Sequence, residues 1–239
     1  YNTVLNATND CEEVWHLAYI NGTKYFYEIP DQVLEVGIKG TINTIDAALE
    51  SGVKKYILAS TSETYNIPTH IPTKENERLI IPNIKNPRFS YGGGKIASEL
   101  LALHYAMVRG LEVIIFRPHN FYGPKMGNEH VIPEMIKKLF ELRRKNKSEI
   151  FDLNIQGSGD ETRSFCYISD AAEGCVLAGT NGSNGEIYHI GTQDEISIRE
   201  LILLIAKLME VSVNIIPSNL LDGSTNKRCP DIYKIREIG

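Results

Sequence analysis

A tyrosine and a lysine four positions apart are the residues of this chain best suited to acid–base chemistry. Tyr91 and Lys95 stand in the segment YGGGKIASELLALHYA, and a helix there places them one turn apart on the same face. An ammonium beside a phenol favours the phenolate, so we expect a lowered pKa for Tyr91 and a role as a base. Thr61, followed by Ser62 and Glu63, ends an apolar run upstream, and its hydroxyl can complete a relay to a substrate hydroxyl. The pattern predicts a proton-transfer centre.

Chance is the competing explanation for this pair, because a Tyr four residues before a Lys arises easily. The three residues between them favour function. Gly92, Gly93 and Gly94 each disfavour a helix interior by about 1 kcal/mol relative to Ala. We therefore expect them to leave room for a neighbour, such as a cofactor or ligand lying against that turn.

Length and composition limit the possible classes of protein. The chain has 239 residues, 42% of them hydrophobic and 23% charged, which suits one large domain or two small ones. No apolar stretch approaches the roughly 20 residues of a membrane span, and the start carries no signal pattern, so we expect no membrane partner and a cytoplasmic location. A net charge of -5 argues against a nucleic-acid partner.

The four cysteines form no Cys-x-x-Cys pair, so we expect no metal and reduced thiols. They are Cys11, Cys166, Cys175 and Cys229. The chain opens without Met and closes at residues 234–239 in what reads as the beginning of a helix. We therefore expect further segments on both sides.

Strand-like and helix-like segments alternate along the chain. Short apolar runs at 13–18, 55–59 and 113–116 suit strands buried on both faces, and 34–52 has the apolar spacing of a helix that ends on glycine. Further along we expect a loop at 124–130, helices at 133–147 and 197–209, and strands at 151–156 and 186–190. This alternation predicts an α/β fold with a doubly wound parallel sheet.

Ligands of parallel α/β sheets bind beyond the carboxyl ends of the strands. Polar residues gather there in three places, at 16–19, 60–63 and 117–122. These three strand ends are expected to meet at one cleft.

Six motifs in order resemble the extended short-chain dehydrogenase/reductases that act on nucleotide sugars, the NAD-dependent epimerase/dehydratases. They are VWHLAY, LASTSETY, YGGGK, FRPHNFYGP, GSGDETRSFCYISD and RCPD, and together they span nearly the whole chain. The resemblance implies tightly held NAD, with NADP not excluded, and a nucleotide-sugar substrate oxidised at C4 to a ketone that later recovers the hydride. It also implies a homodimer.

The same resemblance implies a Rossmann-like domain, with its N-terminal part missing, beside a smaller C-terminal substrate-binding domain. We expect residues 1–123 in the first, with 167–192 returning to it, and residues 124–166 and 193–239 in the second.

Residue roles carry over from the matching motifs. The catalytic residues would be Thr61, Ser62, Glu63, Tyr91 and Lys95, with Tyr91 as base and Lys95 also holding the nicotinamide ribose. Those lining the dinucleotide would be Leu17, Ala18, Tyr19, Ala59, Ser60, Tyr91, Lys95, Pro118 and His119. Those facing the nucleoside diphosphate would be Asn120, Val131, Arg163, Arg228 and Asp231. Planar arginine forks suit a diphosphate, and a carboxylate can accept from ribose hydroxyls.

The chain departs from the family pattern in four respects. The glycine-rich dinucleotide fingerprint and the acidic residue that selects NAD over NADP do not occur in it. Gly37 stands where the family usually has Asn, and Tyr19 replaces a small residue. The nicotinamide pocket is therefore expected to differ in detail.

Several other features have ordinary structural explanations. His16 suits a hydrogen-bonded core histidine, whereas His119 suits a core or a functional role equally. Gly157 and Gly159 indicate a turn, because no GK[ST] follows. The basic residues of 137–147 alternate with apolar ones, as on the solvated face of an amphipathic helix. Arg163 alone also fits a surface ion pair, and Glu63 a solvated loop carboxylate.

Three functional classes fit this sequence: an NAD-dependent enzyme that epimerises, dehydrates or decarboxylates a nucleotide sugar, an NADPH-dependent reductase of a keto sugar, and a catalytically silent dinucleotide-binding relative. The intact Tyr91, Lys95 and Thr61 disfavour the last. Glu63, next to the Thr61 hydroxyl, is placed to take the C5 proton that a 4-ketone acidifies. In the resemblance, Thr-Ser-Glu is the form of GDP-mannose 4,6-dehydratases and UDP-glucuronate decarboxylases, while Ser62 stands where other 4,6-dehydratases use Asp.

Overall fold

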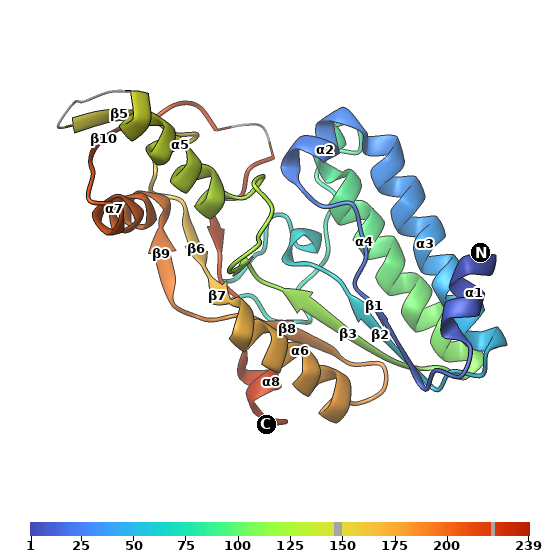
Figure 1. Ribbon diagram of the computed structural model, residues 1–239. Helices are drawn as coiled ribbons and strands as arrows, with labels where there is room; N and C mark the ends of the chain where they lie inside the picture. Colours follow the sequence, from blue (N-terminus) through green and yellow to red (C-terminus); the bar gives the residue numbers. More distant parts are fainter. Residues whose placement is uncertain (146–149, 221–222) are drawn as a thin grey trace.

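Four short strands form the central parallel sheet of the protein. β1 (Glu13–His16), β2 (Lys55–Ala59), β3 (Glu112–Pro118) and β8 (Ile187–Ile190) pair in the order β1-β2-β3-β8. The structure, a computed structural model, describes residues 1–145, 150–220 and 223–239 (Figure 1). The strands expected from the apolar runs are all present, with ends within two residues of the expectation.

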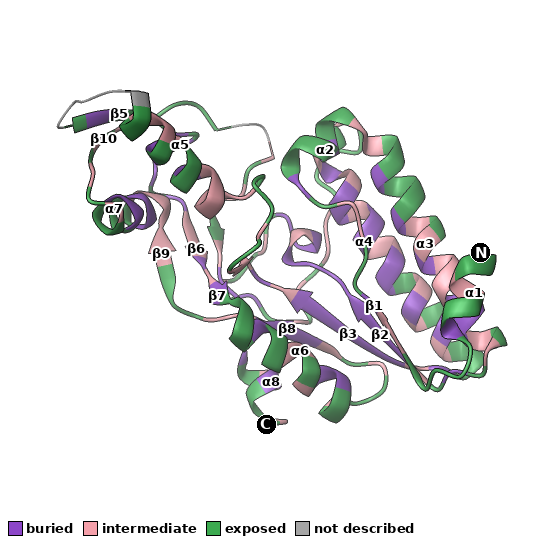
Figure 2. Cartoon of the chain, in the orientation of Figure 1, coloured by how far each residue is buried: buried purple, intermediate pink, exposed green. Residues whose placement is uncertain are grey.

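Both faces of the sheet are covered by helices. On β2, Tyr56 and Leu58 point toward α3 (Pro30–Glu50), and the same core takes in Ala102 just after α4 (Ser90–Leu101). Ile57, between them in sequence, packs on the other face with Ala178 of α6 (Ile168–Asn181). The short α8 (Tyr233–Arg236) completes that second face, and α1 (Asn2–Thr8) lies beside α3 (Figure 1). Because the side chains of a strand alternate between faces, continuous apolar runs suit a sheet buried on both sides (Figure 2).

The Tyr91 helix is regular for only three turns. α4 runs directly into a wider π-helical stretch at Ala102–Ala106, then a 3-10 turn that ends at Gly110 with φ of 99°. Positive φ favours glycine, so Gly110 provides the stop that lets the chain enter β3.

A smaller unit has its own apolar core. Its helices are α5 (Val131–Lys145) and α7 (Ile198–Leu208), and its strands are β5 (Ile150–Asn154), β6 (Thr162–Ser164), β9 (Glu195–Ser197), β10 (Ser212–Ile216) and β11 (Lys227–Arg228). Leu139, Leu153 and Ile202 are buried together there. The separate core supports the expected division into two domains, which stays a prediction. Residues 146–147 of the expected helix lie outside the described residues.

Several elements around the sheet edge were not predicted, because they are too short to show a period. They are α2 (Thr23–Glu28), η1 (Ser62–Thr64), η2 (Pro87–Phe89), β4 (Phe121–Tyr122) and β7 (Cys166–Tyr167). α1 and α6 were also missed. Within the described ranges, no helix is both long and apolar enough to span a bilayer.

Candidate active site

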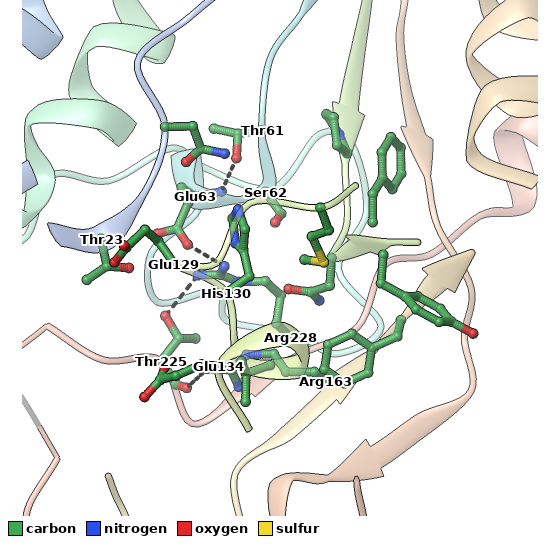
Figure 3. Close-up of a pocket in the computed structure, with 18 of the residues that line it drawn as sticks. Thr23, Thr61, Ser62, Glu63, Glu129, His130, Glu134, Arg163, Thr225 and Arg228 are labelled. Carbon is green, nitrogen blue, oxygen red and sulfur yellow. Dashed lines mark hydrogen bonds and ion pairs between the residues drawn. The ribbon is translucent and has the colours of Figure 1, made fainter. Parts of the chain in front are cut away.

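A cavity of about 820 Å³ opens at the carboxyl ends of the strands, between the sheet and the smaller unit. The sheet side supplies Leu17, residues 59–63 and Pro118, and the smaller unit supplies Val131 and Arg163. In Figure 3, Thr61, Ser62 and Glu63 lie on one side of this space and Arg163 on the other, and Arg228 reaches Glu63. The expected convergence of strand ends on one cleft is thus what the structure shows.

Tyr91 lies in the wall of this cavity between two other aromatic rings. Its ring is parallel to Phe26, with centroids 4.9 Å apart, and meets the edge of Tyr19 at 5.2 Å. Tyr91 is only 5% exposed. This burial raises the pKa of Tyr91 above its usual value, although a hydrogen bond with Thr61 opposes the rise.

Lys95 lies beside Tyr91 but is more deeply buried, at 1% exposure. Its Nζ donates to the Ala59 carbonyl at 2.6 Å, and it lies 4.2 Å from the Tyr19 ring centroid and 5.9 Å from that of Tyr91. Burial lowers the pKa of Lys95 to about 7, while Glu99 raises it. The helix brings the pair together as expected, but burial raises the pKa of Tyr91 instead of lowering it.

The three glycines of YGGGK leave room for the protein's own atoms. A Cβ at Gly92 would lie 2.9 Å from the Glu63 carbonyl oxygen, and one at Gly94 would lie 2.2 Å from the Tyr19 hydroxyl. A Cβ at Gly93 would lie farther from its nearest neighbour, the Ile81 side chain. Within the protein, the close neighbours are therefore η1 and Tyr19.

Glu63 is held between two arginines. Its Oε1 accepts from Arg228 Nη1 at 2.6 Å and its Oε2 from Arg88 Nη2 at 2.9 Å, and its side chain is 19% exposed (Figure 3). The two guanidinium groups overcome the effect of burial and lower the pKa of Glu63 to about 2. Glu63 is thus an ion-paired group and not a solvated loop carboxylate. Arg88 was missed in the sequence, because it belongs to no motif and reaches Glu63 only through the fold.

The two arginines expected at the diphosphate are neighbours on paired strands. Arg163 of β6 and Arg228 of β11 are register partners. Arg163 donates to the carbonyls of Thr225 and Asn226. Burial and the charge of Arg228 lower the pKa of Arg163 to about 10, still far above neutrality. Arg163 is thus a cavity cation and not half of a surface ion pair.

Three of the expected site residues do not line the cavity: Ala18, His119 and Asp231. The His119 ring is buried in the core, 4.7 Å from that of His189, and burial lowers its pKa well below the usual value. Asp231 Oδ1 accepts from the backbone N–H of Tyr233, so its carboxylate is used within the chain at the start of α8. The other expected residues, Asn120 included, do line it.

The structure agrees with two further expectations. His16 is buried near the Thr41 hydroxyl, at 3.4 Å, as expected of a core histidine. Gly157 and Gly159 form a turn whose N–H groups are taken by the backbone and by Glu161. Nowhere in the described part of the chain do three or more His, Cys, Asp or Glu side chains gather to hold a metal ion.

A buried ion pair supports the cavity floor. Arg117 of β3 donates to both carboxylate oxygens of Glu99, at 2.9 and 2.6 Å, and also to the Tyr65 hydroxyl. Ser60 donates to the same Glu99 carboxylate. Because Ser60 precedes Thr61, this pair fixes the end of β2 on which the site is built.

The sheet end of the cavity suits a nicotinamide nucleotide. The Lys95 ammonium has three protons, and it donates one of them to its acceptor among the described residues, the Ala59 carbonyl oxygen. Two protons are therefore available for ribose hydroxyls. Leu17, exposed by 59% at a strand end, offers an apolar surface beside Ala59 and Pro118. The chemistry that NAD supplies when bound is removal of a hydride from the substrate and its later return.

Comparison with known proteins agrees with this geometry. Residues 2–191 match the NAD dependent epimerase/dehydratase family. A UDP-N-acetyl-alpha-D-glucosaminuronate decarboxylase from Bacillus cytotoxicus is 35% identical over 99% of this chain and 73% of its own length. UDP-glucuronic acid decarboxylase 1 from Arabidopsis thaliana is 30% identical over 95% of this chain and 50% of its own length.

A solved structure extends the comparison. The dTDP-glucose 4,6-dehydratase DesIV from Streptomyces venezuelae, in a double mutant with NAD bound, superposes with a TM-score of 0.86 at 25% identity, over 100% of this chain and 70% of that one.

The fold and site define a Rossmann-type enzyme with a Tyr and Lys centre. The chain belongs to the NAD-dependent epimerase/dehydratase family. The resemblance read from the six motifs, the fold class and NAD dependence are confirmed.

Proposed function

We propose that this protein decarboxylates a nucleotide-linked hexuronic acid through a 4-keto intermediate. The observation that carries the proposal is the pair of arginines, Arg88 and Arg228, around Glu63. Two guanidinium groups and one carboxylate leave a net positive charge beside Thr61, which a carboxylate on the sugar would neutralise. A neutral hexose has no such group.

The chemistry after C4 oxidation needs no base at C5. A C4 ketone makes the C6 carboxylate a β-keto acid. The C5–C6 bond breaks, its electron pair moves into the C4 carbonyl as an enolate, CO2 leaves, and C5 then takes a proton from solvent water. Glu63, with a pKa of about 2, is a poor base, which agrees with a reaction that leaves the C5 hydrogen in place.

The residues have distinct roles in this scheme. Tyr91 takes the proton of the C4 hydroxyl and returns it at the end, and Thr61 hydrogen-bonds the same oxygen. Lys95 supplies positive charge beside Tyr91 in its protonated form. Arg88 and Arg228 bind the C6 carboxylate, so in this scheme Arg228 leaves the diphosphate role that the motifs imply, and Arg163 binds the diphosphate.

The relatives support this choice of substrate. The Bacillus and Arabidopsis proteins are named as decarboxylases of UDP-linked uronic acids, so a UDP-hexuronate is the substrate we propose. NAD as the cofactor in preference to NADP, the homodimer and the cytoplasmic location belong to the same proposal.

A second candidate uses Glu63 as a base. The backbone N–H of Glu63 donates to Thr61 Oγ1 at 3.2 Å. Glu63 therefore lies next to the hydroxyl that hydrogen-bonds the substrate in this scheme. Removal of the C5 proton, as in dehydration or C5 epimerisation, would require substrate binding to separate Glu63 from both arginines.

A labelled substrate distinguishes the two candidates. The full chain is incubated with NAD and UDP-glucuronate or UDP-N-acetylglucosaminuronate that carries deuterium at C5. We expect CO2 release and a UDP-pentose that retains the deuterium, measured by mass spectrometry and NMR. Loss of the label would support Glu63 as base, and a C4-epimerised uronate without CO2 would contradict decarboxylation. UDP-glucose is the neutral control and should not be converted.

A further inference from the structure

The Tyr19 ring lies in a slot that exists because two residues on different helices are glycines. A Cβ at Gly37 of α3 would lie 1.9 Å from Tyr19 Cζ, and a Cβ at Gly94 of α4 would lie 2.2 Å from the Tyr19 hydroxyl oxygen. Real Cβ atoms essentially never approach so closely. Any other residue at either position would displace the ring.

The slot turns the face of the Tyr19 ring toward a buried ammonium. Lys95 Nζ lies 4.2 Å from the ring centroid, well inside the range of a cation–π interaction. Among the described residues, the hydrogen-bond acceptor of the ammonium is the Ala59 carbonyl. Because an ammonium loses hydration on burial, the negative face of an aromatic ring is a favourable replacement for water.

We infer that Tyr19 is a positioning residue that holds the charged Lys95 side chain against the sheet, through the face of a ring seated in the Gly37 and Gly94 slot. The phenol itself stays neutral, because burial raises the pKa of Tyr19 to about 12. The ring, rather than the hydroxyl, is therefore the part that acts.

In the described part of the chain, few charged groups lie around Lys95. Glu99, on the same helix, raises the pKa of Lys95, but its carboxylate is bound by Arg117 of β3. His16 of β1 is neutral, because burial and Lys95 lower its pKa to about 4. Tyr91 presents an uncharged ring 5.9 Å away. None of these replaces the contact with the Tyr19 face.

The direct test is a titration of the Lys95 amine. In protein labelled with 15N-lysine, the Nζ signal is assigned by its loss in Lys95→Met and followed against pH. Tyr19→Leu keeps an apolar group in the slot but removes the ring face, and we expect the midpoint to fall by about one pH unit. Tyr19→Phe keeps the face and should leave the midpoint unchanged. Equal midpoints in the wild type and Tyr19→Leu, or a fall in Tyr19→Phe as large as in Tyr19→Leu, would overturn the inference.

A second experiment keeps Tyr19 and closes the slot. Gly94→Ala should push the ring from Lys95 and lower the same midpoint, and it should lower the Tm despite the better helix propensity of Ala. In a Tyr19→Leu background the same change should lower the Tm much less. Additive Tm changes, with the Lys95 midpoint unmoved by Gly94→Ala, would show that the ring does not hold the amine. Neither readout involves a substrate, so the result is independent of the proposed decarboxylation.

Discussion

Glu63 Oε1 and Arg228 Nη1 lie 2.6 Å apart, although 165 positions separate the two residues in the sequence. Glu63 follows a strand of the central sheet, and Arg228 ends β11 of the smaller unit. The ion pair therefore joins the two walls of the cavity at the point where we place the sugar. Arg88 of η2, just before Tyr91, reinforces it.

This ion pair predicts a specific acid sensitivity. The pKa of Glu63 is lowered from 4.5 to about 2, so its contribution to stability is complete above about pH 4.5 and is lost as the pH falls toward 2. Glu63→Gln should reduce the free energy of unfolding at pH 7 by on the order of 3 kcal/mol. Urea unfolding of both proteins from pH 7 to 2 tests this, and a difference that stays constant below pH 4 would contradict it.

Tyr91→Phe should lose turnover without losing structure. The phenol oxygen is the proposed base, whereas the ring packs on Phe26 and Tyr19 in either form. General acid–base catalysis contributes roughly 10²- to 10⁴-fold, so we expect a loss of at least that order in kcat. Steady-state kinetics and the Tm are the measurements. A variant that keeps most of its rate would remove Tyr91 from the mechanism.

Substitutions of Arg163 and of Arg88 should weaken the binding of different ligands. Arg163→Ala should weaken binding of plain UDP by about 1.5 to 3 kcal/mol, the range for hydrogen bonds to charged groups. Arg88→Gln should leave UDP affinity nearly unchanged but weaken UDP-glucuronate. Calorimetry with both ligands, with UDP-glucose as the uncharged comparison, measures this. Equal losses for UDP-glucose and UDP-glucuronate in Arg88→Gln would place the carboxylate elsewhere.

Glu99 and Arg117 should be strongly coupled. Both are nearly fully buried, with Arg117 at 2% exposure, so removing one partner strands the other charge. Glu99→Gln or Arg117→Met alone should cost about 3 to 5 kcal/mol of stability, and the double variant much less than their sum. Urea unfolding of the four proteins completes the cycle, and additive costs would show that the pair acts as two independent residues.

The sequence by itself determined the sheet and the pairing of Tyr91 with Lys95. Apolar runs such as 55–59 are local patterns, since a strand buried on both faces must be apolar throughout, and β2 appears at those residues. Tyr91 and Lys95 share a helix face because four residues make about one turn, which no tertiary contact needs to enforce.

Only the tertiary structure decided the chemical state of those residues. The pKa of Tyr91 and of Glu63 depends on what desolvates or pairs with each group, and for Glu63 the partners come from η2 and β11. Arg88 and the Tyr19 slot likewise arise where segments distant in sequence meet. Electrostatic energies depend on distance and burial in space, so spacing along the chain predicted which groups are present but not the charge each one carries.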